Sequence, residues 1–300
     1  MTDRAISVVI PAYNEEAVIG RLLTSLRYRS ADDEIIVVCD GCSDSTAEVA
    51  RSFAGVEVME KPRGGKPSAL NTGDSRATRF PRFFVDADIV VTATALHEVA
   101  DLMIEGIEAG APRCEVDLRL SSWAVRRFYD VWTKLPYLTE GMLGSGVLGL
   151  TQRGRARFQE FPPVIDDDEF VRRLFTIDER VHGTAGAFIV TAPARVGPLI
   201  RIKTRSRLGI MELDGLQGPA PRSSGSPGRS AAKELLASPR LWPSIAVFAV
   251  IRTVVGSRAW WRCRRGRFEG WARDESSRLG AAGDGNRKPQ SVPDGTDGRN

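Results

Sequence analysis

Cysteine and histidine are scarce in this chain, which contains 4 cysteines and 2 histidines among its 300 residues. Cys39 and Cys42 form the one close cysteine pair, and neither a second pair nor a neighbouring histidine completes a set of four ligands. A disulfide scaffold is therefore excluded, and a structural zinc site has little support. Two interpretations of the pair stay open, namely a metal or redox role and two small residues in a turn.

The start of the sequence lacks the features of a secretion signal. Met1 to Arg4 leads directly into a short apolar run that soon reaches Pro11, so the charged, apolar and cleavage regions of a signal peptide are missing. We therefore expect the protein in the cytoplasm.

Uninterrupted apolar runs long enough to span a bilayer are also missing. The most apolar stretch, Leu241 to Val255, contains Pro243 and Arg252 and falls short of the roughly 18 to 20 residues that a spanning helix needs. Seven arginines and one acid lie between Arg252 and Arg273. This composition favours a helix lying on an anionic membrane surface, peripheral at the inner face of the cell membrane. Burial against the rest of the chain and a true span are the alternatives.

Strong charge of one sign and recognisable nucleic-acid-binding modules are absent as well. The net charge is +4, and the hydrophobic share of 42% is ordinary for a chain that folds around a core. We find no internal repeat. These features predict a globular protein with no nucleic-acid partner.

What is present is an alternation of apolar runs and segments with helical period. The predicted buried strands are Ile6 to Ile10, Glu34 to Cys39, Val56 to Glu60 and Arg82 to Val85. Asn14 is a candidate cap for the first helix, Ser45 with Glu48 a candidate capping box for the second, and a third helix is expected to begin near Lys66. The alternation predicts an α/β fold with a mostly parallel central sheet and helices on both faces.

Polar clusters follow these strands where each strand ends. They are Pro11 to Glu15, Asp40 to Asp44, Arg63 to Asn71, and Asp86 to Asp88. Parallel strands bring their carboxyl ends to one edge of the sheet, where ligands bind in the crevice beyond that edge. We therefore expect these clusters to form one ligand site.

Asp86 and Asp88 are spaced to project to the same side of an extended chain. Hard divalent cations such as Mg²⁺ or Mn²⁺ take oxygen ligands and are commonly held by one or two carboxylates together with substrate phosphates. The pair predicts a divalent cation that bridges to a diphosphate. An isolated Asp-x-Asp can also be a solvated strand end.

Taken together, the motifs resemble the family 2 glycosyltransferases, which have the Rossmann-like GT-A fold. The resemblance covers Ile6 to Arg207. The opening ISVVIPAYNEE is similar to the segment that wraps the nucleotide base and ribose, and it implies that role for Pro11, Tyr13 and Glu15.

The next three motifs extend the resemblance. The run VVCDGCSDST resembles the family's Asp-Asp-Gly-Ser-x-Asp turn, with cysteines at two of its positions, and implies that Asp40 contacts the base. GGKPSALNTG implies that Lys66 lies near the nucleotide or diphosphate. FVDADIVV matches the metal-binding Asp-x-Asp motif, with Asp88 as the expected direct ligand beside Asp86.

The segment IDDDEFVRRL supplies a candidate base. It resembles the family's Glu-Asp-x-x-Leu-x-x-Arg-Leu segment, which implies that Asp167 is the catalytic aspartate and that Asp166 stands in place of Glu. A register shifted by one residue, to Asp168, stays open. Helix capping by Asp166 is the alternative role for this acidic cluster.

The resemblance implies an inverting, metal-dependent glycosyltransferase that moves a sugar from a nucleoside-diphosphate donor to a glycan or lipid-linked acceptor in polysaccharide or glycolipid synthesis. The Gln-x-x-Arg-Trp motif of processive members is missing, so addition of one sugar is expected. One alternative is a non-catalytic family member that binds a sugar nucleotide. The other is a nucleotidyltransferase, which would require a glycine-rich basic signature after the first strand. Four basic residues after the last strand either neutralise the departing diphosphate or form a helix face toward solvent or membrane, namely Arg201, Lys203, Arg205 and Arg207.

The implied organisation has four parts. A GT-A domain at 1–214 contains a nucleotide-binding half, 1–90, and an acceptor half, 91–214. A flexible loop at 215–230 leads to a basic, apolar helical segment at 231–275 that associates with membrane. A disordered tail at 276–300 completes the chain.

Overall fold

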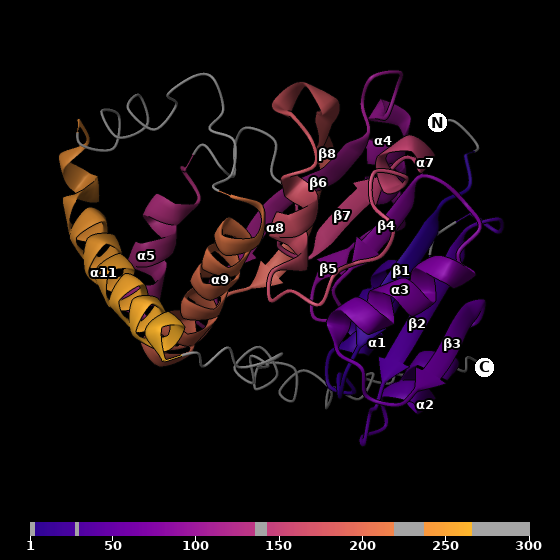
Figure 1. Ribbon diagram of the computed structural model, residues 1–300, viewed down its shortest axis with the longest axis horizontal. Helices are drawn as coiled ribbons and strands as arrows, with labels where there is room; N and C mark the ends of the chain where they lie inside the picture. Colours follow the sequence, from indigo (N-terminus) through magenta and orange to yellow (C-terminus); the bar gives the residue numbers. More distant parts are fainter. Residues whose placement is uncertain (1–3, 28–29, 136–142, 219–236, 266–300) are drawn as a thin grey trace, which may run out of the picture.

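A central sheet of eight strands organises the computed structural model, which describes residues 4–27, 30–135, 143–218 and 237–265 (Figure 1). The strands are β1 Ser7–Ala12, β2 Glu34–Asp40, β3 Val56–Lys61, β4 Arg82–Val85, β5 Val90–Val91, β6 Ala109–Asp117, β7 Val147–Leu150 and β8 Arg180–Thr191. Their order is β3-β2-β1-β4-β7-β6-β8-β5. Strands β3, β2, β1 and β4 run parallel, β7 is antiparallel to both of its neighbours, β6 and β8 are parallel, and β5 is antiparallel to β8. The predicted α/β class with a mostly parallel sheet is confirmed.

Helices cover both faces of this sheet (Figure 1). The α-helices of the described residues are α1 Ile19–Ser25, α2 Thr46–Arg51, α3 Lys66–Arg76, α4 Ala93–Leu102, α5 Trp123–Trp132, α7 Gln152–Arg155, α8 Asp167–Arg172, α9 Val196–Gln217 and α11 Trp242–Arg264. Val8 and Ile10 of β1 share one core with α1, α2 and α4, whereas Val9 shares the core on the opposite face with α3 and α8. This alternation follows from the two-residue period of a strand. Gly73 lets α3 approach the sheet closely, since a Cβ there would collide with Val9.

A third core joins α5, α9 and α11 beside the sheet, at the left of Figure 1. Phe128 of α5 stacks on Phe248 of α11 with ring centroids 5.1 Å apart. Leu199 of α9 and Ile251 of α11 are buried in the same cluster. The expected C-terminal helix is present, and it packs one side against the rest of the chain.

Two predicted helix caps are wrong. Asn14 has a positive φ of 52° and lies before α1, and its side-chain oxygen accepts a hydrogen bond from the Ser43 N–H at 2.8 Å. Ser45 occupies the N-cap of α2 without a side-chain capping bond, while the Asp44 carboxylate accepts the Thr46 N–H at 3.1 Å. The hydrogen bonds of both side chains depend on how the loops after β1 and β2 pack together, and this packing cannot be predicted from the local sequence.

The predicted segment boundaries also differ from the structure in places. Helix α9 continues to Gln217, so the expected loop at 215–230 begins inside a helix, and its part from 219 on lies outside the described residues. The expected tail at 276–300 lies outside them as well.

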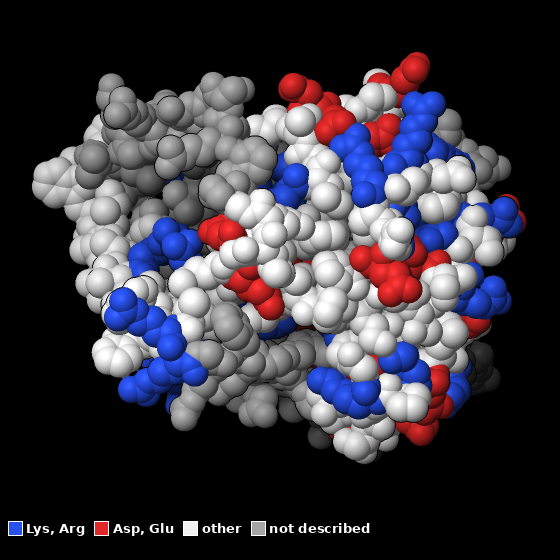
Figure 2. Space-filling view, in the orientation of Figure 1, with Lys and Arg blue, Asp and Glu red and all other residues white. Residues whose placement is uncertain are grey.

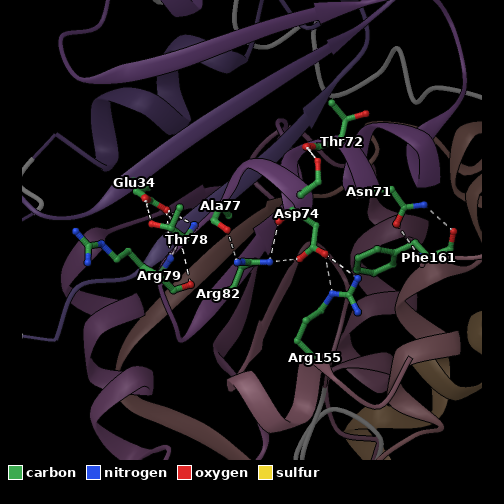
Figure 3. A network of polar contacts seen from close by, with 12 residues as sticks. Glu34, Asn71, Thr72, Asp74, Ala77, Thr78, Arg79, Arg82, Arg155 and Phe161 are labelled. Atoms are coloured by element: carbon green, nitrogen blue, oxygen red, sulfur yellow. Dashed lines mark hydrogen bonds and ion pairs between the residues drawn. The ribbon is translucent and has the colours of Figure 1, made fainter. Parts of the chain in front are cut away.

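The amino ends of the strands are tied together by a polar network (Figure 3). Glu34, at the start of β2, accepts the backbone N–H of Thr78 at 2.8 Å. The guanidinium of Arg155 donates to Asp74 at 2.9 Å, and Arg82 donates to the backbone carbonyl of Asp74 at the same distance. This network links α3, β4 and α7 at the edge opposite the strand-end clusters, so we assign it to stability.

Candidate functional site

A cavity of about 330 Å³ lies beyond the carboxyl ends of β1 and β4, between the sheet, α5, α8 and α9. Of the eight predicted site residues, the structure brings six to its lining, which are Pro11, Glu15, Lys66, Asp86, Asp88 and Asp167. They come from strand-end loops, from the start of α3 and from α8. The expectation that separate motifs form one site is therefore met for these six.

Lys66 is the centre of the polar contacts in this cavity. Its ammonium lies 2.8 Å from Asp86 Oδ1 and 3.0 Å from Asp167 Oδ2, and its side chain is 12% exposed. Burial alone would lower the pKa of Lys66, but the carboxylates of Asp167, Asp86 and Asp168 outweigh it and hold the pKa well above its ordinary value. Lys66 therefore stays charged and joins the metal-site candidate to the base candidate.

Asp86 and Asp88 lie directly after β4 and both line the cavity. In the described part of the chain, no group of three or more His, Cys, Asp or Glu side chains is gathered to hold a metal alone. Two carboxylate side chains next to an open cavity fit a cation that completes its shell with phosphate oxygens and water, as Mg²⁺ commonly does. The donor set therefore suits a divalent cation brought together with a phosphorylated ligand.

The three aspartates at the start of α8 all line the cavity but have different partners. Asp166 caps the helix by accepting the Glu169 N–H at 3.1 Å, as the alternative role for this cluster predicted. Asp167 pairs with Lys66. Asp168 accepts the backbone N–H of Ser145 at 2.8 Å. Asp166 and Asp168 are thus committed to backbone groups, whereas Asp167 contacts a side chain.

Burial shapes the acidity of the two flanking aspartates. It raises the pKa of Asp166 to about 6 and that of Asp168 to about 7, because an ionised carboxylate loses hydration inside the protein. Neighbouring carboxylates raise both values further, and Lys66 opposes the shift. Both flanking carboxyls are therefore weaker acids than an exposed aspartate.

Asp40 and Tyr13 are the two predicted site residues outside the cavity lining. Asp40 is fully buried, and its carboxylate accepts the backbone N–H groups of Gly64 and Gly65 at 2.8 and 2.7 Å. In this structure the Asp40 side chain thus orders the loop before α3. The Tyr13 ring lies beneath the Arg63 guanidinium, 3.2 Å from the ring centroid, in the same group of loops.

The structure places three of the four basic residues after the last strand at the cavity, a position that the sequence had left open. Arg201, Lys203 and Arg205 line the cavity, together with the aromatic rings of Tyr129 and Trp132 from α5. The sequence shows these basic residues after the last strand, but their direction depends on how α9 packs against α5. Helical period alone could not place them at the cavity.

The two cysteines of the close pair lie in different elements, with Cys39 buried in β2 and Cys42 in the turn after it. Cys42 accepts the Asn14 N–H through its sulfur at 3.3 Å, and the cysteines are free thiols. A hydrogen bond from Cys39 lowers the pKa of Cys42 to about 7, and the same contact raises that of Cys39. Only Cys42 therefore lies in the turn that the sequence suggested for both residues.

Comparison with known proteins relates the geometry to a family. Residues 7–146 match the family model described as glycosyl transferase family 2. A 4,4'-diaponeurosporenoate glycosyltransferase of Staphylococcus aureus (strain USA300) is 29% identical over 166 residues, which is 54% of this chain and 43% of that protein. The match thus spans less than half the length of that relative.

Solved structures show the fold. A mannosyltransferase from Pyrobaculum calidifontis, in complex with GDP-Man and Mn²⁺, has a TM-score of 0.57 at 19% identity and covers 93% of this chain and 86% of its own. The glucosyl-3-phosphoglycerate synthase from Mycobacterium tuberculosis, in complex with Mn²⁺, UDP and glucosyl-3-phosphoglycerate, has a TM-score of 0.50 at 23% identity and covers 73% and 82%. Both likenesses support the GT-A fold predicted from the sequence.

Proposed function

We propose that this protein, whose residues 7–146 match the model of glycosyl transferase family 2, is a metal-dependent glycosyltransferase that uses a nucleoside-diphosphate sugar. One observation carries the proposal. Asp86, Asp88, Lys66 and Asp167, from three separate motifs, line one cavity at the carboxyl edge of the sheet.

The donor is proposed to lie with its diphosphate at Lys66 and the Asp86–Asp88 turn. These two aspartates would hold Mg²⁺ or Mn²⁺, which supplies positive charge to the departing diphosphate. Pro11, Tyr13 and Glu15 would contact the base and ribose, while Asp40 would act through the backbone of the loop that it orders. The metal-bound complexes of the two structural relatives support this arrangement.

Asp167 is proposed as the general base of an inverting transfer. It would accept the proton of the acceptor hydroxyl as that oxygen forms a bond to the anomeric carbon. The bond from this carbon to the diphosphate oxygen breaks, and the nucleoside diphosphate leaves with the bonding electrons. Asp167 suits this role because its flanking aspartates are bound to backbone N–H groups.

Membrane association at the inner face of the cell membrane is proposed for α11. By length and composition alone, the helix Pro239–Arg264 could cross a membrane, so a span stays an alternative to docking on the surface. The helix extends beyond the apolar run into the arginines. One side of it packs on α5 and α9, while Trp242, Val250 and Trp261 are more than half exposed. This arrangement supports docking on the membrane surface and a glycan or lipid-linked acceptor.

Donor turnover tests the proposal. The purified chain is incubated with UDP-glucose or GDP-mannose, with Mn²⁺ or with a chelator, and release of the nucleoside diphosphate is measured. We expect release with at least one donor that stops when the metal is chelated. Metal-dependent binding without turnover, even when candidate acceptors are added, would favour the non-catalytic alternative.

A further inference from the structure

The α9 side of the cavity carries positive charge that the proposed donor contacts do not use. Residues 198, 201, 202, 205 and 206 line the cavity at helical spacing, so one face of α9 forms this wall. Arg201 and Arg205 lie on that face, and Lys203 reaches the cavity beside α5. The wall formed by α8 and the end of β4 is acidic, with Asp86, Asp88 and the aspartates 166–168.

These cations have no fixed counter-charge. In the ranges that the structure describes, Arg201, Lys203 and Arg205 form no salt bridge, and Arg205 donates one long hydrogen bond, 3.4 Å, to the carbonyl of Ile165. Arginines elsewhere in the fold are held by carboxylates, as Arg155 is by Asp74 at 2.7 Å. A wall of unpaired cations at a cavity is suited to an anionic ligand.

Among these cations, Lys203 shows most clearly the cost of a positive charge without a counter-charge. Its ammonium lies 4.0 Å from the Trp132 ring centroid and 5.8 Å from that of Tyr129, and both rings line the cavity. Burial lowers the pKa of Lys203 to about 8, which reflects the cost of removing the ammonium from water. An anion at this position would offset that cost, and the adjacent rings offer apolar surface to the group that carries it.

We propose that the α9 wall binds a phosphate group carried by the acceptor, with the rest of the acceptor against Tyr129 and Trp132. The inference rests on the proposed function, because it assigns the donor diphosphate to Lys66 and the Asp86–Asp88 turn. A phosphorylated lipid and a small phosphorylated metabolite share this chemistry. The acidic wall would then face the donor cation, and the basic wall would orient the attacking acceptor.

Titration calorimetry with inorganic phosphate tests the proposal. The full chain is used both free of nucleotide and saturated with Mg²⁺ and UDP or GDP. We expect Arg201→Met and Lys203→Met to weaken phosphate binding roughly tenfold to a hundredfold, as expected for loss of a charged contact. Arg207→Met is the matched control, because Arg207 is exposed on the same helix and does not line the cavity. It should bind phosphate as the unmodified chain does.

Two results would overturn the inference. One is displacement of the bound nucleoside diphosphate by phosphate, which would show that the α9 cations bind the donor diphosphate and not the acceptor. The other is unchanged phosphate binding in Arg201→Met, an exposed substitution that leaves the core intact. Failure of UDP and GDP to bind would contradict the proposed function alone, since phosphate binding is also measured without nucleotide.

A second probe distinguishes a phosphorylated lipid from a small phosphorylated metabolite. Dodecyl phosphate, below its micellar concentration, should bind far more tightly than inorganic phosphate if the acceptor is a lipid, and about equally if it is a small soluble molecule. In both cases Lys203→Met should weaken the binding.

Discussion

At the scale of single residues, Lys66 connects the candidate metal site to the candidate base. Its ammonium contacts Asp86 and Asp167, so the metal-site candidate and the base candidate share one charge. When a cation and a diphosphate enter, Lys66 can exchange its carboxylate partners for phosphate oxygens without losing ionic contacts. Asp167 would then be released toward the acceptor.

The role of Asp167 gives the first prediction. Asp167→Asn keeps the size of the side chain and removes its basicity, so turnover should fall by roughly 100-fold to 10,000-fold while the donor affinity changes little. Steady-state kinetics and donor titration on the same preparation measure the two effects.

Parallel variants test the register of this aspartate. Asn caps a helix about as well as Asp, and its amide oxygen can still accept a backbone N–H, so we expect Asp166→Asn and Asp168→Asn to keep most of their contacts and to show no selective loss of turnover. If Asp168→Asn alone loses turnover with its donor affinity intact, the base is Asp168. If none of the three variants differs, a carboxylate base at α8 is excluded.

Glu34 gives a prediction on pH and stability. Burial acts to raise its pKa, but hydrogen bonds from Ser7, Thr78 and the backbone outweigh this effect and lower the pKa from 4.5 to about 2. A depressed pKa contributes stability that is present above pH 4.5 and is lost as the pH falls toward 2. Denaturant unfolding should therefore show Glu34→Gln to be less stable than the unmodified chain at pH 7, with a difference that shrinks below pH 4.5. A difference that stays constant down to pH 3 would refute this account.

At the scale of elements, the strands and their polar ends follow from the sequence, and the packing of distant helices does not. The runs ending at Ala12, Asp40 and Val85 are apolar and bounded by polar turns, so each strand could be predicted from its local sequence. The direction of α9 depends on contacts with α5 and α11, which lie far from it in the chain. For this reason six of the predicted site residues reach the cavity, while the position of the basic residues of α9 stayed open until the structure placed them there.

The exposed side of α11 gives the prediction at this scale. Arg264 and Arg265 lie over the rings of Trp260 and Trp261, and basic side chains gather at the C-terminal end of the helix, at the lower left of Figure 2. We expect the full chain to float with vesicles of phosphatidylcholine and phosphatidylglycerol, and less with phosphatidylcholine alone.

A matched pair of variants assigns this binding to the helix. Trp242→Ser with Trp261→Ser should reduce flotation strongly, because the tryptophans are 59% and 55% exposed and contribute apolar area. Ile104→Ser, at a position 69% exposed after α4, should not. Equal flotation of all three proteins would show that α11 is not the docking element.

At the scale of the whole molecule, the fold separates stability from chemistry. The polar network of Figure 3 joins the amino ends of the strands, and the cavity lies at their carboxyl ends. The core of α5, α9 and α11 supplies the cavity with its basic and aromatic wall. One sheet edge therefore carries the stabilising polar network, while the other carries the proposed site for a donor, a cation and an acceptor.

The central claim, that a divalent cation at Asp86 and Asp88 brings a sugar nucleotide to this cavity, is tested most directly by thermal unfolding with nucleotide sugars and Mn²⁺. A ligand at 100 times its Kd stabilises the folded state by about 2.7 kcal/mol. We predict a rise in Tm with at least one nucleotide sugar that needs Mn²⁺, is lost in Asp88→Ala, and persists in Asp32→Ala, an exposed aspartate before β2. An undiminished Mn²⁺-dependent rise in Asp88→Ala would contradict the account.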